Sequence, residues 1–131
     1  MFYVAILDLD SFKNINDTFG HSAGDDVLKE FARIVKNQVR VSDYFGRFGG
    51  EEFLLLLTQT TLATAPVFAE RIRAIVESCD WPSIPHQLKV TVSTGIAEYR
   101  LQENIENTLR RADAALYRAK QAGRNRVEGG T

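Results

Sequence analysis

The sequence has few of the features that mark exported, membrane-spanning or nucleic-acid-binding proteins. Cys79 is the only cysteine, so an intramolecular disulfide is impossible and a reducing compartment suits the chain. The longest apolar runs, 2–7 and 53–57, are far too short to span a bilayer, and no basic segment precedes the first. Acidic and basic residues nearly balance at a formal net charge of −1, so any anion site must be local. We expect a cytoplasmic domain that contacts neither nucleic acid nor membrane.

Length and composition predict one folded domain. The 131 residues are close to the commonest size of a single domain. Hydrophobic residues make up 44% and charged residues 25%, as in ordinary globular proteins. We expect a single domain over 1–128 and a flexible tail at 129–131.

The spacing of apolar residues predicts alternating strands and helices. Strands are expected at 2–7, 43–48, 51–58 and 88–99, with a short last strand from 126–127, and helices at 26–39, 64–77 and 104–122. Gly49-Gly50 has the spacing of a two-residue hairpin turn, and Gly24-Asp25 is a start signal for the first of these helices. The order predicts an α+β architecture with helices on an antiparallel sheet.

Two acidic residues follow the first strand. Asp8 and Asp10 are two positions apart, so an extended chain places both carboxylates on one side. Such a pair beside a core is unfavourable unless a cation joins it. Alternatively, Asp10 caps a short helix that begins near Ser11, and Asp8 is solvated at a strand edge.

A second acidic pair, Glu51-Glu52, follows the two hairpin glycines. If this hairpin strand lies beside the first strand, Glu51 meets Asp8, and a cluster of hard oxygen ligands suits Mg²⁺ that carries phosphates. The same acids are also compatible with a soluble hairpin tip. Only their combination with the other segments makes them informative.

Five segments, in order, resemble the signature motifs of the GGDEF family. They are 8–17 (Asp-Leu-Asp-Ser-Phe-Lys-Asn-Ile-Asn-Asp), 20–25, 47–53 (Arg-Phe-Gly-Gly-Glu-Glu-Phe), 91–97 and 112–120, the last followed by Gly123-Arg124-Asn125. The third segment carries the GGEEF variant. The resemblance covers nearly the whole chain and implies a diguanylate cyclase, which condenses two GTP molecules into the bacterial second messenger cyclic di-GMP. It also implies a five-stranded, mostly antiparallel sheet flanked by helices, of the nucleotidyl-cyclase and polymerase-palm type.

By this resemblance, the carboxylates of Asp8 and Glu51 and the carbonyl of Leu9 bind Mg²⁺, with Mn²⁺ as a substitute. Glu52 helps to hold the metal or takes the proton of the attacking 3′-hydroxyl, which is a poor nucleophile at neutral pH. Lys13 adds positive charge for catalysis and phosphate binding. From its surroundings in the sequence alone, Lys13 is a solvated lysine.

The resemblance also implies a set of substrate contacts. They are Ser11, Phe12, Lys13, Asn16, Asp25, Gly49, Gly50, Lys120 and Arg124. Amides around Ser11 and Phe12 would cradle phosphates at a helix N-terminus, and Asn16 with Asp25 fits guanine better than adenine. Each has an alternative: Asn16 as a turn residue, Asp25 as a helix cap, and Lys120 and Arg124 as partners of a helix dipole.

An Arg-x-x-Asp pair, Arg40 and Asp43, begins nine residues before Gly49, where active members of the family often bind their product as an inhibitor. Arg71 stands where a secondary arginine of that site is often found. An arginine fork suits phosphate and guanine, although chance pairs at this spacing are common on surfaces.

The family's domain usually begins with a further helical segment, whereas this chain opens on its first strand. We therefore expect a fragment of a larger sensor protein, whose other regions can include a membrane anchor. Turnover requires a homodimer of half-sites, because each GTP attacks the other. The rivals are a catalytically silent module that binds GTP or cyclic di-GMP and an interaction domain without nucleotide.

Overall fold

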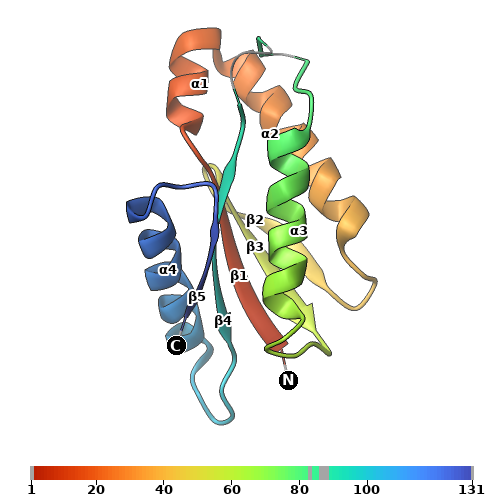
Figure 1. Ribbon diagram of the computed structural model, residues 1–131, viewed down its shortest axis with the longest axis vertical. Helices are drawn as coiled ribbons and strands as arrows, with labels where there is room; N and C mark the ends of the chain where they lie inside the picture. The colour runs from red at the N-terminus through yellow and green to blue at the C-terminus, as the bar shows by residue number, and fades with distance from the viewer. Residues whose placement is uncertain (1, 83, 86–88, 131) are drawn as a thin grey trace.

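The computed structural model describes residues 2–82, 84–85 and 89–130, which form a five-stranded sheet with helices on both faces (Figure 1). The strands are β1 (Phe2–Leu9), β2 (Tyr44–Gly49), β3 (Glu52–Thr58), β4 (Val92–Glu98) and β5 (Val127–Gly130). The helices are α1 (Phe12–Phe19), α2 (His21–Gln38), α3 (Ala65–Ser78) and α4 (Ile105–Gln121). The strand order is β2-β3-β1-β4-β5, antiparallel except for the β4–β5 pair. The predicted α+β class and mostly antiparallel five-stranded sheet are confirmed.

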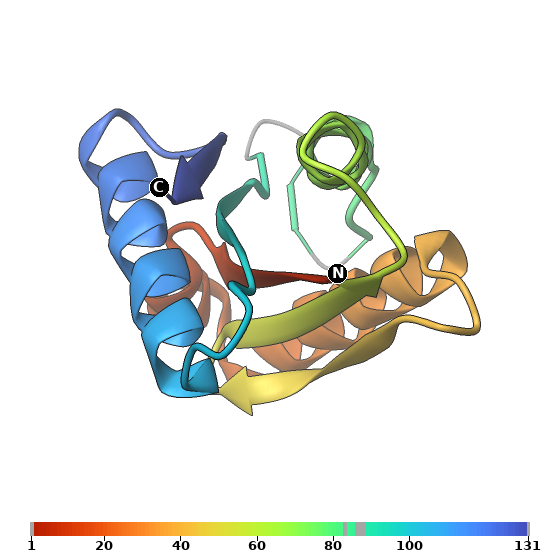
Figure 2. The same ribbon diagram turned by 90° about the horizontal axis from the view of Figure 1, so that it is seen from below.

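Strand β1 lies at the centre of the sheet and is buried on both faces. Tyr3, Ala5 and Leu7 face the larger core, whereas Val4 and Ile6 face α4. Helices α2 and α3 cover the first face and α4 covers the second (Figure 2). This two-sided burial explains why β1 reads as a continuous apolar run instead of an alternating one.

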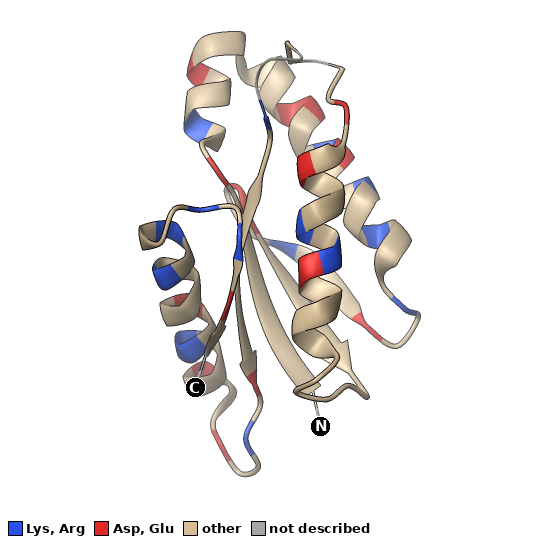
Figure 3. Ribbon diagram, viewed as in Figure 1, with Lys and Arg blue, Asp and Glu red and all other residues tan. Residues whose placement is uncertain are grey.

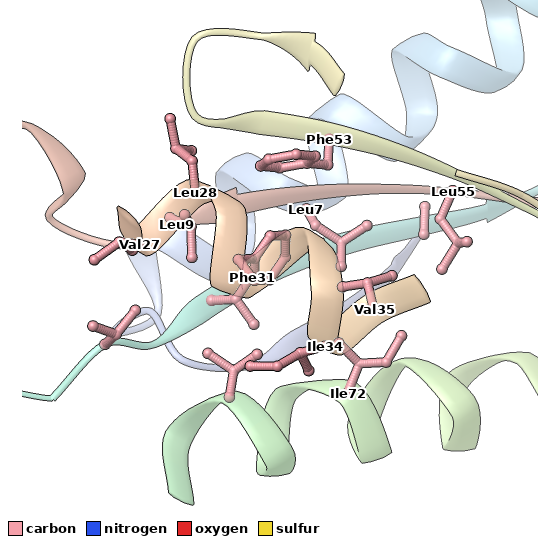
Figure 4. Packing of buried hydrophobic residues seen from close by; sticks show 14 of the residues in the cluster. Leu7, Leu9, Val27, Leu28, Phe31, Ile34, Val35, Phe53, Leu55 and Ile72 are labelled. Carbon is pink, nitrogen blue, oxygen red and sulfur yellow. The ribbon is translucent and has the colours of Figure 1, made fainter. Parts of the chain in front are cut away.

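The larger core lies between the sheet, α2 and α3. Phe31 of α2 packs beside Leu7 and Leu55 of the sheet, with Ile72 of α3 across from them (Figure 4). All four side chains are at most 1% exposed. The site residues at the strand ends are therefore attached to a sheet that is held in place by a packed core.

Helix α4 approaches β4 closely at Gly95. A Cβ atom built there would lie 2.1 Å from the Ala112 carbonyl oxygen and 2.3 Å from the Leu116 nitrogen. Only glycine lets the two backbones come so near. This contact fixes the height of α4 above the sheet and hence the position of Lys120 near its end.

Helix α2 begins five residues before its predicted start at 26. Gly24 and Asp25, interpreted as a start signal, lie inside the helix, and Gly24 is buried against α1. The missing side chain makes room for Asn16, whose Oδ1 would lie 1.7 Å from a Cβ at position 24. The short helix expected near Ser11 is α1.

The hairpin turn and the flanking strands also differ in detail from the prediction. Gly49 pairs with Glu52, so the turn residues are Gly50 and Glu51, and Gly50 has a φ of 47°. Strand β4 starts at Val92 instead of 88, and residue 88 lies outside the described residues. Strand β5 extends to 130 and pairs in parallel with β4, so the described part of the expected tail belongs to the sheet.

No helix in the described ranges is long and apolar enough to cross a membrane.

Candidate functional site

The ends of β1 and β3 bring the predicted acidic residues together. Asp8 and Glu52 are opposite each other in the antiparallel pairing, and the amide of Leu9 donates to the Glu51 carbonyl over 3.3 Å. Asp8 continues the row of β1 side chains that face α4. Glu52, and not Glu51 as predicted, is therefore the direct neighbour of Asp8, because the turn lies one residue further along than expected.

Asp8 occupies an environment that favours a bound cation. It is half-buried, and its Oδ1 accepts no hydrogen bond from the described residues. Burial raises the pKa of Asp8 to about 7 against the attraction of Lys120, and repulsion from Glu51, Glu52 and Asp10 adds to the rise. The pKa of Glu52 is also raised, first by burial and then by Asp113 and Glu51. A positive ion would relieve both effects.

The donor set fits Mg²⁺ that is carried by a substrate. Across 2–82, 84–85 and 89–130, no three acidic, histidine or cysteine side chains converge into a ready-made metal site. Protein sites for Mg²⁺ commonly supply only one or two carboxylates and leave the other positions to phosphates and water. Asp8 with an acid of the hairpin meets that requirement.

Asp10, the second acid of β1's end, is fully engaged. Its Oδ1 accepts from Lys120 Nζ and Ser93 Oγ, both at 2.7 Å, and its Oδ2 from Thr91 Oγ1 at 2.8 Å and the Asn125 amide at 3.0 Å. Burial pushes its pKa up, but these bonds hold the pKa of Asp10 below the ordinary value. The alternative that Asp10 caps the helix is wrong, because the N-cap of α1 is Ser11.

Lys120 connects the two acids. Its Nζ lies 2.7 Å from Asp10 Oδ1 and 3.7 Å from Asp8 Oδ1. Figure 3 shows basic positions at the end of α4 and in the following loop, close to the acidic end of β1. Arg124 is exposed in that loop, with a φ of 65°. Both predicted phosphate contacts therefore stand at the same end of the sheet as Asp8.

A pocket of about 420 Å³ adjoins these acids on the α1–α2 side. Its lining residues are Phe12, Lys13, Asn16, Asp25, Leu28, Arg47, Gly50 and Glu51. Six of them belong to the predicted site. The buried Oδ1 of Asn16 accepts no hydrogen bond within the described chain. Gly49 instead pairs in the hairpin, and Ser11 is exposed before α1.

Sequence reasoning missed Arg47 and Leu28 in this pocket. Arg47 Nε donates to the Gly50 carbonyl over 2.8 Å and so holds the hairpin turn. Arg47 stood within the motif at 47–53, which was the available signal. Leu28 lies on the apolar face of α2, and that spacing alone indicates a core residue.

A second pocket, of about 450 Å³, lies between the end of α2 and α3. Its lining residues are Gln38, Arg40, Leu57, Gln59, Thr60, Thr64, Val67, Phe68 and Arg71. Arg40 binds Asp43 through Nε and Nη2 at 3.1 and 3.0 Å and also donates to the Thr58 carbonyl. Arg71 lies over the Phe68 ring, 5.1 Å from its centroid. The structure thus brings the three residues of the predicted inhibitory site together.

Comparisons with known proteins identify relatives of this chain. Residues 1–126 match the family described as "Diguanylate cyclase, GGDEF domain". The chain is 46% identical over 125 residues to Diguanylate cyclase A of Treponema denticola, covering 95% of this chain and 34% of that protein. It therefore spans about a third of that relative's length.

Two solved structures share the fold. The GGDEF domain of DgcB from Caulobacter crescentus in complex with c-di-GMP has a TM-score of 0.91 and 36% identity, over 98% of this chain and 77% of that one. The active GGEEF domain of a diguanylate cyclase from Vibrio cholerae has a TM-score of 0.90 and 34% identity, over 99% and 83%.

Proposed function

This chain belongs to the GGDEF family of diguanylate cyclase domains, and we propose that it condenses two GTP molecules into cyclic di-GMP and two pyrophosphates. The observation that carries the proposal is the position of the Asn16–Asp25 pocket directly beside the acidic ends of β1 and β3. A guanine bound in the pocket extends its phosphates toward Asp8 and Lys120. The motif at 49–53 is the GGEEF form, as in the active domain of the Vibrio cholerae structure.

The proposed reaction consists of two equivalent displacements. The 3′-oxygen of one GTP forms a bond to the α-phosphorus of the other, and the bond from that phosphorus to the oxygen bridging to the β-phosphate breaks. Pyrophosphate leaves, and the hydroxyl proton passes to Glu52, which faces the same side of the sheet as Asp8. One chain offers one such pocket among its described residues, so two copies must face each other for turnover.

Members of this family generally use a divalent metal ion. We propose Mg²⁺, or Mn²⁺ in its place, held by Asp8, Glu51, Glu52 and the Leu9 carbonyl. When bound, the ion would neutralise charge on the phosphates and lower the pKa of the hydroxyl. The buried Oδ1 of Asp8, which accepts no hydrogen bond from the described residues, supports this assignment.

The other proposed contacts divide between base and phosphates. Asp25 accepts from the N1 and N2 donors of guanine and Asn16 matches its edge, while Phe12 and Leu28 form apolar walls. The amides of Ser11 and Phe12, with Lys13, bind phosphates where α1 begins. Lys120 and Arg124 complete the positive charge from the opposite side, and Gly49 shapes the hairpin next to Gly50.

We also propose that the pocket lined by Arg40 and Arg71, with Asp43 bonded to Arg40, binds cyclic di-GMP and inhibits the enzyme. The guanidinium groups of Arg40 and Arg71 line one cavity, as recognition of two phosphates and two guanines requires.

We propose a cytoplasmic location, where GTP is abundant.

The decisive experiment incubates the purified domain with GTP and Mg²⁺ at a series of protein concentrations and measures cyclic di-GMP by chromatography. We expect rates that rise more steeply than linearly with protein concentration, because the half-sites must meet. The Glu52→Gln variant should lose about a hundredfold or more in rate. GTP binding without any product would show a silent binding module, and absence of binding would exclude a nucleotide function.

A further inference from the structure

A hydrogen-bonded chain runs from the surface of α3 to the phosphate end of the proposed site, and Asn125 is its central link. Resting on the proposed function, we propose that Asn125 is a positioning residue. It ties Asp10 and Lys120 to α3 and thereby holds Lys120 and Asp8 in place for the metal-bound triphosphate.

Asn125 uses three of its polar groups at once. Its side-chain Oδ1 accepts from Arg73 Nη1 over 2.8 Å, and its Nδ2 donates to Glu77 Oε2 over 2.7 Å. Its backbone amide donates to Asp10 Oδ2 at 3.0 Å and to Ser93 Oγ at 3.2 Å. The side chain thus points to α3, while the backbone of the same residue holds the site.

The anchor on α3 is itself fixed. Arg73 donates to Glu70 over 2.8 and 2.6 Å and to Glu77 over 3.1 Å, and its side chain is only 16% exposed. Ile72 and Val76 on the same helix are completely buried in the core. Asn125 is therefore joined to a rigid element and not to another loop.

The contacts that lead from the Asn125 backbone toward the proposed substrate site are short. Asp10 is 4% exposed and binds Lys120 Nζ at 2.7 Å, and that Nζ lies 3.7 Å from Asp8 Oδ1. Partners that orient the groups around a metal commonly change metal affinity or activity 10–100-fold when they are removed. We propose that Asn125 is such an orienting partner of Lys120 and Asp8.

The backbone conformation of Asn125 fits this double role. Its φ of 49° is left-handed, a region that asparagine and glycine tolerate better than other residues. The loop keeps other ties without the side chain, since the Arg124 amide donates to the Ala119 carbonyl and the Thr94 amide to the Arg126 carbonyl, both at 2.9 Å. Removing the side chain therefore cuts the link to α3 while leaving the loop attached.

The test compares two ligands in the Asn125→Gly variant, which retains the backbone amide and tolerates the positive φ. One ligand is 3′-deoxy-GTP with Mg²⁺, which lacks the attacking hydroxyl and cannot turn over. The other is guanosine, which reaches only the pocket of Asn16 and Asp25. We expect affinity for 3′-deoxy-GTP to fall about tenfold or more and affinity for guanosine to change less than about twofold.

Two further variants sharpen the test. Gln102→Gly replaces another exposed residue of positive φ, 65°, at the far end of α4, and should change neither affinity. Arg73→Ala cuts the same link from the other side. If both substitutions break the same link, their effects on affinity should not add. The double variant of Asn125→Gly and Arg73→Ala should then bind 3′-deoxy-GTP as tightly as whichever single variant has the lower affinity.

The outcomes are distinct. If the wild-type protein does not bind 3′-deoxy-GTP, the proposed function fails and this inference fails with it. If the wild type binds and Asn125→Gly binds equally well, only the inference is overturned. Equal loss of both ligands would show general damage to the fold and would also overturn the positioning role.

Discussion

Asp8 and Asp10 are two positions apart, yet their surroundings give them opposite properties. Asp10 receives hydrogen bonds from Lys120, Thr91, Ser93 and Asn125, so its carboxylate is satisfied within the protein. Asp8 is half-buried, and its Oδ1 accepts no hydrogen bond from the described residues. Burial together with nearby acids raises the pKa of Asp8 to about 7. Of the two acids, Asp8 is the one left open to a ligand.

Single residues should also determine base recognition. Asp25→Ala should raise KM for GTP about 10–100-fold, because hydrogen bonds to a charged group contribute about 1.5–3 kcal/mol. Asp25 is exposed, so the unfolding temperature should stay the same. Steady-state kinetics and thermal melts measure the two effects. Asp17→Ala, an exposed acid on the neighbouring helix, is the matched control, and an equal rise in its KM would refute the assignment.

Among the elements, the connection from β4 to α4 is held by an ion pair. Arg111 Nη2 lies 2.5 Å from Glu103 Oε2, and Thr108 Oγ1 donates to the same oxygen over 2.7 Å. The Arg111 hydrogen bond first, and then that of Thr108, lowers the pKa of Glu103 from 4.5 to about 2. The pair fixes where α4 begins.

The lowered pKa predicts how stability depends on pH. The contribution of Glu103 is complete above pH 4.5 and is lost as the pH falls through about 2. The free energy of unfolding, measured with urea, should therefore drop more steeply over this window in the wild type than in Glu103→Gln. Arg111→Gln should remove the same slope. Identical slopes in all three proteins would contradict the role of the pair.

Helices and strands with a clear pattern of apolar residues could be predicted from the sequence. Contacts between residues far apart in the chain could not. The strand at 2–7 followed from a continuous apolar run, and the end of the helix at 104–122 followed from Gly123. The start of α2 was missed because Gly24, normally a helix breaker, makes room for Asn16 in the tertiary structure. The bonds from Ser93 and Asn125 to Asp10 join residues 83 and 115 positions apart, and no local pattern contains them.

At the scale of the whole molecule, the pocket beside the acidic strand ends is separate from the pocket between α2 and α3. Their linings share no residue. A ligand can therefore occupy the second pocket without displacing one from the first. The proposed inhibition through the second pocket would therefore act on the fold or on the pairing of two copies.

This arrangement makes binding at the second pocket separately measurable. In the wild type, cyclic di-GMP at about 100 times Kd should stabilise the domain by about 2.7 kcal/mol. Arg40→Ala should abolish this shift in thermal melts. It should also lower the stability of the free protein, because the Asp43 side chain, 0% exposed, loses its cation.

Arg33→Ala is the matched control, since Arg33 forms a similar ion pair with Glu30 on α2 outside the second pocket. Its ligand-induced shift should equal that of the wild type. A full shift in Arg40→Ala would exclude this pocket as the product site.

The central place of β1 also governs how the chain acquires its structure during synthesis. β1 is made before both of its neighbours, and its second partner is complete only at Glu98. Until then one edge of the apolar run at 2–7 has no strand to pair with. Folding through such distant pairings is slow, on the order of milliseconds to seconds, and leaves time for aggregation. A strand that secures the finished site is thus the segment that most needs protection while the protein is being made.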